Sequence, residues 1–589
     1  ATGEPQLALR AGQLLAPRLV RASAPALVPP TAAAWPLASA APGTLDALVL
    51  RELPAAALEP GPGQVTVEIR AAGLNFRDVL IALGMYPTLD APIGGEGAGV
   101  ITAIGEGVTD LAVGDRVLGM FPRAIGTAAV ADRRWLTRLP AAWSFAQGAA
   151  IPIAYLTAWY GLIELGALRP GQRVLIHAAA GGVGAAAVEI ARHAGAEVFA
   201  TASPAKWDLL RARGFDDAHT ASSRDPAFAA RFAGIQVDVV LNALAGPFID
   251  ASLGLLVPGG RFIELGKRDL RPAAEIEAAH GVRYLPFDLA DVEPDRIARM
   301  LDEVMLRFAA GTFTPPRPTV RDVREAPDAF RTLGGGHLAG KLVLAIPPRL
   351  DPDGVVLITG GTGTLGAHVA RHLVAHHGVR HLVLASRRGA GAPGAPALAE
   401  ELVSLGAASV ELAACDVARR DSLASLLGAL SRPLTGIVHT AGITDDGVIA
   451  ALTPDRLDTV LRGKAFAALH LHELTSRPGA PEPAMFVLFS SVAGTLGSPG
   501  QGNYAAANAF LDGLAEARRR DGHAALSLAW GLWEDASGIT GSLDARDRAR
   551  MARAGIEALS TARGLALLDA ALASPAATLA PIGLDLAAL

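Results

Sequence analysis

Two glycine-rich turns, each lying between an apolar strand-like run and a helix-like run, constrain the fold of this chain most strongly. The first turn, 181–184, follows the run 172–177, and the second, 360–366, follows the run 355–359. Glycine lets the backbone approach a pyrophosphate, and the N-terminus of the following helix attracts its negative charge. The sequence therefore predicts two nucleotide-binding β-α-β units.

Composition argues against several classes of function. Charged residues make up 19% of the 589 residues and the net charge is −5, so no basic surface for nucleic acid is expected. The single cysteine, Cys415, cannot form a disulfide within the chain. Apolar runs break before about 18 residues, and residues 1–21 lack a signal-peptide pattern. We therefore expect a cytoplasmic protein without a membrane span, built from two to four domains.

The distribution of strand-like and helix-like runs along the chain sets the expected domain boundaries. Residues 38–150 and 305–347 are rich in strand-like runs, whereas 151–304 and 348–589 alternate between strand-like and helix-like runs. This pattern predicts an α/β fold with two Rossmann-type parallel-sheet domains, the first inserted into a β-rich substrate domain. Residues 1–37 contain two short strand-like runs and a Pro/Ala-rich linker, and an isolated hairpin must pack on something else to be stable.

The first glycine-rich turn is expected to bind NADPH. An NAD site would place Asp or Glu at the end of the next strand, to hold the ribose 2′-hydroxyl. Here that position reads Thr-Ala-Ser-Pro-Ala-Lys over 201–206, and a hydroxyl with a cation suits a 2′-phosphate. The candidate cofactor residues are Gly181, Gly182, Val183, Gly184, Ser203 and Lys206.

The second turn leads to the same expectation. The strand after it ends in Ser386, Arg387 and Arg388, and two guanidinium groups can bind a 2′-phosphate. Asp416 suits an adenine contact, and the pair 441–442 suits the strand end under a nicotinamide. The candidate cofactor residues are Gly360, Gly363, Leu365, Gly366, Ser386, Arg387, Arg388, Asp416, Val417, Ala441 and Gly442.

The stretch 490–508 carries a candidate catalytic pair. Ser491 ends an apolar strand-like run and Tyr504 opens a helix-like run, so both fall where open α/β sheets bind ligands. The serine can hydrogen-bond a carbonyl oxygen while the tyrosine delivers a proton to it. A free phenol titrates near ~10, so a cation is needed, and Asn508, one helical turn on, does not supply it. If the glycine-rich turn 360–366 were absent, we would interpret Ser491 and Tyr504 as residues of an ordinary loop.

Residues 44–346 resemble the medium-chain dehydrogenase/reductase family. The segments that carry the resemblance are 75–79, Asn-Phe-Arg-Asp-Val, with 94–99, Gly-Gly-Glu-Gly-Ala-Gly, and the turn 177–184. Zinc-containing members have a His ligand at the position of Gly95 together with Cys ligands, and this half has no Cys, so no metal is expected. Through 203–207 and 266–269 the resemblance is to the enoylreductase domains of modular polyketide synthases.

The enoylreductase resemblance implies hydride addition at Cβ of an enoyl thioester and protonation at Cα. Lys267 and Asp288 are the implied proton-donor candidates, and Tyr86 matches a tyrosine that accompanies a 2S methyl branch. Structural readings stay open beside these roles. Lys267 could be a solvated strand end, Asp288 a helix cap and Tyr86 a packing residue of its turn.

From residue 355 to about 572 the chain resembles the short-chain dehydrogenase/reductase family. Most members carry Lys four residues after the catalytic Tyr, but here Asn508 stands there and Lys464 lies on the preceding predicted helix. This exchange marks the ketoreductases of polyketide synthases. The resemblance implies that Tyr504 protonates the ketone oxygen, Ser491 binds it, Lys464 favours the phenolate and Asn508 orders a proton relay.

The segment 444–446, Thr-Asp-Asp, resembles the Leu-Asp-Asp loop of B-type ketoreductases, which give 3R-hydroxyl products. Asp446, the diagnostic acid, is present, while Thr444 in place of Leu is a departure that concerns the packing of the loop. Three other features are interpreted as structural: the stripe His368, His372 and His376, the triplet 421–423, and Cys415. None of them predicts a metal or attachment site.

Together these features predict an enoylreductase–ketoreductase segment of a modular type I polyketide synthase, with two NADPH sites. The implied partners are an acyl carrier protein bearing a phosphopantetheine-bound acyl chain, and other synthase domains. Residues 1–21 resemble the last strands of a ketoreductase structural subdomain, so we expect a chain cut from a longer polypeptide, with this piece on the ketoreductase half. The alternatives are a stand-alone pair of quinone and carbonyl reductases, or a non-catalytic docking scaffold.

Overall fold

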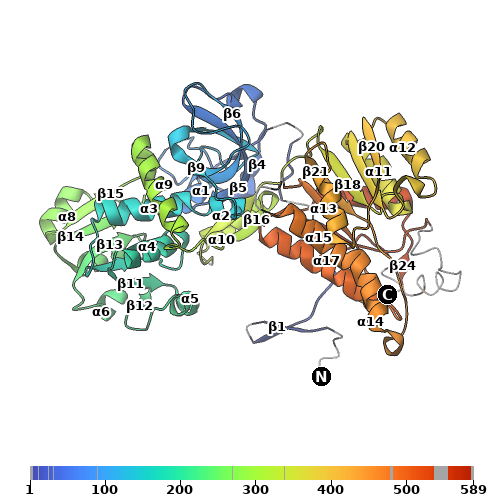
Figure 1. Ribbon diagram of the computed structural model, residues 1–589. Helices are drawn as coiled ribbons and strands as arrows, with labels where there is room; N and C mark the ends of the chain where they lie inside the picture. The colour runs from blue at the N-terminus through green and yellow to red at the C-terminus, as the bar shows by residue number, and fades with distance from the viewer. Residues whose placement is uncertain are drawn as a thin grey trace.

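The computed structural model describes residues 4–585, except 5, 11, 24–25, 31, 33, 89, 268, 337, 478–479, 481, 536–552 and 554. Three large β-sheets organise this part of the chain. Figure 1 shows the first parallel sheet and its helices on the left, the second on the right, and the β-rich domain above and between them. The expected α/β fold class is confirmed, with two Rossmann-type sheets and a separate β-rich domain.

The first parallel sheet has the strand order β12-β11-β10-β13-β14-β15. Its strands are β10 (Arg173–Ile176), β11 (Glu197–Ala202), β12 (Thr220–Ser222), β13 (Val237–Asn242), β14 (Leu256–Glu264) and β15 (Arg283–Pro286). Its main helices are α3 (Pro152–Trp159), α4 (Gly182–His193), α7 (Pro247–Leu253), α8 (Ala273–His280) and α9 (Pro294–Ala309). The order reverses between β10 and β13, so a ligand crevice is expected at the carboxyl ends of these strands.

The β-rich domain is built on a seven-stranded sheet. Two strands at one edge of this sheet come from the part of the chain that follows the inserted Rossmann domain. Its strands are β5 (Gln64–Leu74), β6 (Glu96–Ile104), β7 (Arg116–Met120), β8 (Ala128–Asp132), β9 (Leu136–Arg138), β16 (Thr319–Asp322) and β17 (Leu342–Ala345). Helices α1 (Phe76–Ala82) and α10 (Ala326–Gly334) pack beside it. Because β17 pairs with β5, the two stretches that flank the insertion form one domain.

The second parallel sheet has the order β20-β19-β18-β21-β22-β23-β25. Its strands are β18 (Val355–Thr359), β19 (His381–Ser386), β20 (Ser409–Ala414), β21 (Leu434–His439), β22 (Met485–Ser491), β23 (Leu526–Trp530) and β25 (Thr578–Leu579). Its main helices are α11 (Thr364–His377), α12 (Ala395–Ser404), α13 (Arg420–Gly428), α14 (Pro454–Leu461), α15 (Ala467–Thr475), α17 (Gly502–Arg520) and α19 (Thr561–Leu572). The continuous apolar runs of β18, β21 and β22 are buried on both faces, as strands covered by helices must be.

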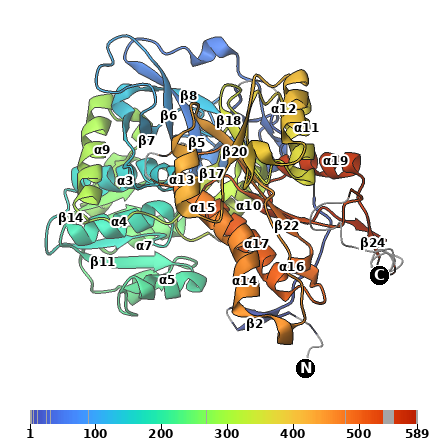
Figure 2. The ribbon, with the colours of Figure 1, turned by 45° about the vertical axis from the view of Figure 1, so that its right-hand side comes forward.

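The two halves meet where α17 lies against β16 (Figures 1 and 2). Asp322, at the end of β16, is 2.8 Å from Arg324 and 2.9 Å from Arg519 of α17. Arg324 also donates to the carbonyl oxygen of Leu572, at the end of α19, at 3.1 Å. A cavity of about 870 Å³ lies beside this junction. We call the set Asp322, Arg324 and Arg519 the joint.

The N-terminal segment forms the predicted hairpin, β1 (Ala8–Arg10) with β2 (Gln13–Leu15), but all six strand residues are exposed. The predicted packing of this hairpin on the second Rossmann half is therefore wrong for the described residues, and Figure 1 shows it standing apart. A two-stranded ladder of three pairs buries too little apolar surface to fix its own position. One helical stretch, Phe145–Leu165, is apolar enough to cross a membrane, but 67% of its apolar window is buried, as in the core helix of a soluble domain.

Candidate active sites

The first candidate site is a cavity of about 810 Å³ between the β-rich domain and the first Rossmann sheet. Its floor is the turn before α4, where Gly181 is the N-cap and Gly182 the first helical residue. A Cβ on Gly184 would lie 2.3 Å from the carbonyl oxygen of Ala178, so only glycine fits there. Gly181, Gly182 and Val183 of this turn line the cavity, and a glycine turn at a helix N-terminus is the cradle that a pyrophosphate requires.

Ser203 and Lys206, predicted to bind the 2′-phosphate, both line this cavity. The ammonium group of Lys206 donates to the carbonyl oxygens of Gly336 at 2.7 Å and Leu338 at 2.5 Å, on the β-rich side. Burial and the nearby Arg224 charge lower the pKa of Lys206. Arg224 also lines the cavity and was missed from the sequence. Arg224 follows the third strand of this sheet, β12, whereas the prediction from the sequence considered only the residues after the second strand, β11.

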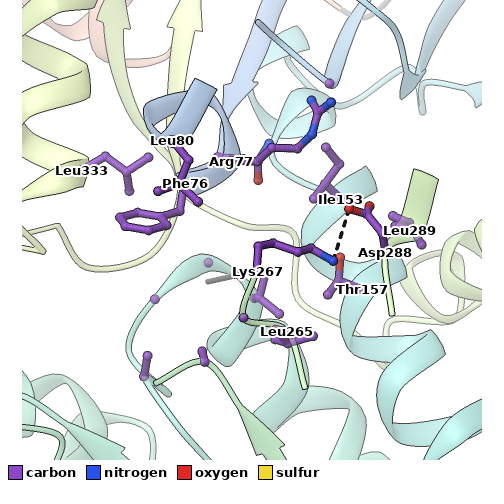
Figure 3. Close-up of a pocket in the computed structure, with 18 of the residues that line it drawn as sticks. Phe76, Arg77, Leu80, Ile153, Thr157, Leu265, Lys267, Asp288, Leu289 and Leu333 are labelled. Carbon is purple, nitrogen blue, oxygen red and sulfur yellow. Dashed lines mark ion pairs between the residues drawn. The ribbon is translucent and has the colours of Figure 1, made fainter. Parts of the chain in front are cut away.

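Tyr86, Lys267 and Asp288 all line this cavity. Figure 3 shows the side chains of Lys267 and Asp288, which follow β14 and β15, pointing toward one another. The Lys267 ammonium lies 3.2 Å from an Asp288 oxygen and donates to the carbonyl oxygen of Phe287 at 2.5 Å. The Tyr86 hydroxyl donates to Asp288 at 2.9 Å, and the Arg77 guanidinium lies 4.8 Å from the Tyr86 ring centre. We call Tyr86, Lys267 and Asp288 the proton-donor cluster.

Protonation within this cluster follows from its surroundings. Burial raises the pKa of Tyr86, so the phenol keeps its proton at neutral pH. Burial also raises the pKa of Asp288, but the N–H of Ala290, the Lys267 charge and the Tyr86 hydroxyl together lower it below its usual value. Asp288 is therefore ionised. Asp288 also caps a short helix by accepting from the N–H of Ala290 at 3.0 Å. Helix capping and the predicted role in the proton-donor cluster are therefore compatible in this residue.

A buried polar network beneath the cavity was not predicted. The Lys341 ammonium lies 2.5 Å from Glu96 and donates to the side-chain oxygen of Asn75 at 2.6 Å. Asn75 in turn donates to Glu96 at 2.7 Å, and Glu96 is fully buried. A Cβ on Gly182 would lie 3.3 Å from the Lys341 side chain. The network thus holds the β-rich domain against the cofactor turn.

In the second candidate site, Lys464 and Tyr504 are brought together from different helices. Lys464 lies on a short π-helix, η10 (Arg462–Phe466), between α14 and α15. Its ammonium donates to the Tyr504 hydroxyl at 3.3 Å and lies 4.7 Å from the centre of the tyrosine ring. Both side chains are more than nine-tenths buried. The cation that the sequence of α17 does not supply is therefore provided by η10.

Asn508 and Ser491 complete this site. The Asn508 amide donates to the carbonyl oxygen of Tyr504 at 2.8 Å, and its own side-chain oxygen is buried without a partner among the described residues. Ser491 lies at the carboxyl end of β22 and accepts from the N–H of Ala493 at 3.3 Å, which leaves its O–H to donate elsewhere. His439 is held between Thr359 and the Lys464 carbonyl, and burial lowers its pKa to about 4, so it stays neutral.

The second cofactor turn lies directly beside these residues. Gly360 has φ of +70°, and a Cβ on it would lie 2.8 Å from the backbone nitrogen of Ala441, the predicted nicotinamide edge. A Cβ on Gly366 would lie 2.5 Å from the carbonyl oxygen of Gly360, while Gly363 caps α11. The turn therefore has the same glycine-dependent cradle as the first site.

The remaining predicted cofactor residues follow the strands as expected. Ser386 ends β19 and accepts from the N–H of Gly389 at 3.1 Å, and Arg387 and Arg388 are exposed beyond it. Asp416 accepts from the N–H of Ala418 at 3.2 Å, just after β20. Two exposed guanidinium groups at this strand end remain available to a phosphate.

The 444–446 loop is tied to the start of α17. Asp446 accepts from the side chain of Gln501 at 2.8 Å, and Asp445 forms an ion pair with Arg456 at 2.7 Å. Asn503 donates to the carbonyl oxygen of Asp445 at 2.8 Å. The loop is thus held next to Tyr504 by residues that the sequence did not single out, Arg456 and Gln501.

His372 of the predicted histidine stripe and the nearby His377, both on α11, belong to a hydrogen-bonded cluster. His372 and His377 lie 2.8 Å and 2.7 Å from the same oxygen of Asp569 on α19. Burial raises the pKa of Asp569, but the two imidazoles lower it below its usual value. Cys415 is buried, contacts Ser422, and has a pKa raised by burial.

Comparisons with protein families find three matching domains along the chain. Residues 61–150 match the alcohol dehydrogenase GroES-like domain, 214–344 match the zinc-binding dehydrogenase domain, and 354–535 match the KR domain. The described residues that line the first cavity include no His and no Cys, so they do not fit the zinc of the second description. Both glycine cradles fit a dinucleotide, and the two reductase domains are NADPH-dependent.

Curated relatives cover both halves. The chain is 55% identical over 608 residues to polyketide synthase GfsB of Streptomyces halstedii, covering all of this chain and 11% of that protein. It is 52% identical over 612 residues to the pikromycin polyketide synthase component PikAII of Streptomyces venezuelae, covering all of this chain and 16% of that protein. The chain thus spans well under half the length of these relatives.

Solved structures match the first half. The crystal structure of CurK enoyl reductase is 37% identical with a TM-score of 0.51, covering 53% of this chain and 99% of that one. The JamJ enoyl reductase in its apo form is 32% identical with a TM-score of 0.51, with the same coverage. With the relatives that span both halves, these matches identify the chain as a member of the modular type I polyketide synthases, formed by an enoylreductase domain followed by a ketoreductase domain.

Proposed function

We propose that the chain reduces acyl groups carried on the phosphopantetheine arm of an acyl carrier protein, at two separate sites. The second site reduces a β-ketoacyl group to a (3R)-hydroxyacyl group, and the first reduces an α,β-enoyl group to a saturated one. The observation that carries the proposal is the buried Lys464–Tyr504 contact of 3.3 Å. His439 connects the Lys464 carbonyl to Thr359, the last residue before the second glycine turn. Bound NADPH supplies the hydride at each site.

At the second site, the free hydroxyl protons of Ser491 and Tyr504 are suited to hold the ketone oxygen. Tyr504 gives up its proton to that oxygen as the β-carbon is reduced, which is general acid catalysis. The Lys464 ammonium, 3.3 Å from the phenol oxygen, stabilises the phenolate that remains. Asn508 fixes the first turn of α17 through the Tyr504 carbonyl, and so keeps the phenol in place.

The 3R outcome rests on the 444–446 loop. Asp446 is held by Gln501 beside the start of α17, so the loop limits the side from which an acyl chain reaches Tyr504. The 2S outcome at the enoyl site rests on Tyr86, which lies in the cavity beside Lys267 and Asp288. Both assignments extend the resemblance to polyketide synthase reductases.

At the first site, the reduced enoyl group must be protonated at Cα. Asp288 is ionised and accepts from its neighbours, so it orients the donors and does not itself act as the acid. That leaves Lys267 and Tyr86 as the groups that carry a transferable proton. The apolar residues of the cavity, such as Phe76, Leu80 and Leu289, suit an acyl chain.

We also propose a domain division in which residues 38–150 and 305–347 form the substrate domain, 151–304 its Rossmann insertion and 348–589 the ketoreductase, and the pairing of β17 with β5 supports it. The proposed setting is a cytoplasmic synthase with the carrier protein and other synthase domains as partners. The relatives, which are components of polyketide synthases, support these partners.

The test is NADPH oxidation by the purified chain with a β-keto and an enoyl pantetheine thioester, followed by chiral analysis of both products. We expect both thioesters to be reduced, giving 3R and 2S products. Free quinones and simple ketones serve as comparison substrates. A chain that reduced these at higher kcat/KM than the thioesters would contradict the proposal.

A further inference from the structure

One face of α17 carries a third polar residue beyond the two assigned to catalysis. Tyr504, Asn508 and Asp512 are spaced by four, so they lie one above the other along the helix. Asp512 is partly buried on the side of α17 that packs against β22 and β23. An acidic residue in this position needs a structural or chemical reason.

Hydrogen bonds connect Asp512 to the catalytic residues. Ser527, fully buried on β23, donates to an Asp512 oxygen at 2.6 Å. Ser490, which precedes the catalytic Ser491 on β22, is buried and donates to the carbonyl oxygen of Asn508 at 3.2 Å. The Ser490 hydroxyl also lies within hydrogen-bonding reach of the Asp512 carboxylate. The single Ser490 proton can go to the Asn508 carbonyl oxygen or to the Asp512 carboxylate, so Ser490 connects the strand that carries Ser491 to this face of α17.

Charge connects Asp512 to Lys464 as well. Lys464 of η10 and Glu516 of α17 are the charged groups that act on Asp512, and Ser490 and Ser527 are the polar groups that face it from β22 and β23. The Lys464 ammonium itself donates to the Tyr504 hydroxyl. Asp512 therefore supplies a negative charge that acts on the same ammonium group as Tyr504.

We propose that Asp512 is a positioning residue for ketone reduction, which holds Ser490 at the junction of β22 with α17 and balances the charge of Lys464. It touches neither substrate nor cofactor. This inference rests on the proposed ketone reduction at the second site. Its own consequence is that ketone reduction needs the ionised form of Asp512.

The pH dependence follows from the surroundings of the carboxylate. Burial raises the pKa of Asp512, and the nearby Glu516 raises it further, against the hydrogen bonds from Ser527 and Ser490 and the Lys464 charge. The carboxylate is ionised above that raised pKa and becomes protonated as the pH falls through it. The kcat for ketone reduction should therefore fall on the acid side at a pH above the usual carboxyl range.

The test is the substitution Asp512→Asn, since the amide has the shape of the protonated acid without its titration. We expect kcat for ketone reduction to fall roughly tenfold, a loss of about 1.4 kcal/mol of transition-state stabilisation. We expect KM for the thioester to stay unchanged and the acid limb of the kcat profile to disappear. Enoyl reduction by the same chain should be unaffected, which makes it an internal control for folding.

Two neighbouring substitutions should move the acid limb in opposite directions. Ser527→Ala removes a hydrogen bond that stabilises the carboxylate, so the limb should move to higher pH. Glu516→Gln removes a negative charge that disfavours it, so the limb should move to lower pH. Asp512→Glu, which restores the charge, should regain part of the lost rate.

A wild-type kcat and acid limb in Asp512→Asn would overturn the proposal, provided that the wild-type chain reduces the ketone. An inactive wild type would instead contradict the proposed function itself. If Asp512→Asn also lost enoyl reduction, that variant would not be correctly folded. The position of the acid limb in Ser527→Ala and Glu516→Gln would then test the role of Asp512. Limbs that did not move, or that moved in the same direction, would then overturn the role of Asp512.

Discussion

Lys464 reaches Tyr504 because the helix that carries it widens into a single π-turn, and such turns occur frequently at functional sites. Its ammonium is held against the phenol oxygen in a buried setting, where an unpaired charge would be costly. At the other site, Asp288 gathers Lys267 and Tyr86 in the same way, by accepting from one and pairing with the other. In each site one residue orients the group that transfers the proton.

The role of Asp288 can be tested with Asp288→Asn. The amide cannot form the ion pair with Lys267, so the donor loses its orientation and kcat for enoyl reduction should fall on the order of 10²-fold. Asp291→Asn, three residues on and exposed, is the matched control and should leave this rate unchanged. Ketone reduction should stay at the wild-type rate in both variants. An equal loss in the two variants would show that Asp288 acts only as a helix cap.

Arg224 and Lys206 should both contribute to the choice of NADPH at the first site. Hydrogen bonds to charged groups are worth about 1.5–3 kcal/mol, so Arg224→Met should raise KM for NADPH in enoyl reduction roughly 10–100-fold. KM for NADH should change little, because NADH lacks the 2′-phosphate. Steady-state kinetics with both cofactors measures this, with Arg231→Met, an exposed arginine that does not line the cavity, as the control. Equal loss with the two cofactors would remove Arg224 from phosphate binding.

At the scale of elements, the two glycine turns set how closely a dinucleotide can approach each sheet. Gly366→Ala places a Cβ 2.5 Å from the Gly360 carbonyl oxygen, a backbone atom that cannot move aside easily. Overpacking costs about 1–3 kcal/mol, so KM for NADPH in ketone reduction should rise roughly 5–150-fold. Enoyl reduction should not change. Gly428→Ala, whose Cβ meets nothing within 4 Å, is the matched control, and an effect of similar size there would contradict the steric account.

The sheets and their turns were predictable because each follows from a local run of residues. The strand that precedes each turn is apolar and the glycines follow at fixed spacing, so both cradles could be located before their contacts were known. The π-turn of η10 and the network of Asn75, Glu96 and Lys341 depend on contacts between distant segments. The exposed hairpin β1–β2 shows the same limit, since a strand pattern does not specify its neighbour.

At the scale of the whole molecule, the two reductase halves are held together by the joint. Asp322 is buried between Arg324 and Arg519, which come from opposite sides of the contact. Burial raises the pKa of Asp322, but Arg324 and Arg519 lower it below its usual value. Because the folded-state pKa lies below the unfolded one, the stability that it contributes is present above the usual carboxyl pKa and is lost only as the pH falls through the lower value. The joint should therefore hold throughout the range in which the two reductions are measured.

Removing one cation from the joint should separate the unfolding of the two halves. In Arg519→Met, Asp322 keeps its ion pair with Arg324 but loses its contact with α17. Calorimetry should then show two unfolding transitions, one for each half, that are further apart in temperature than in the wild type. Asp322→Ala should lower the free energy of unfolding by more, about 3–5 kcal/mol, because it leaves the buried charge of Arg324 without its carboxylate partner. Arg520→Met, next along α17 and exposed, is the control. Identical transitions in Arg519→Met and the wild type would contradict a stabilising joint.

The central claim is that one chain holds two reduction sites with different proton donors, and a crossed assay tests it most directly. Wild type, Tyr504→Phe and Lys267→Ala are each measured with a β-keto and an enoyl pantetheine thioester. We predict that Tyr504→Phe lowers kcat for ketone reduction by about 10²–10⁴-fold and leaves enoyl reduction intact, and that Lys267→Ala slows enoyl reduction alone. Loss of both reductions in either variant, or of neither in Tyr504→Phe, would contradict the account.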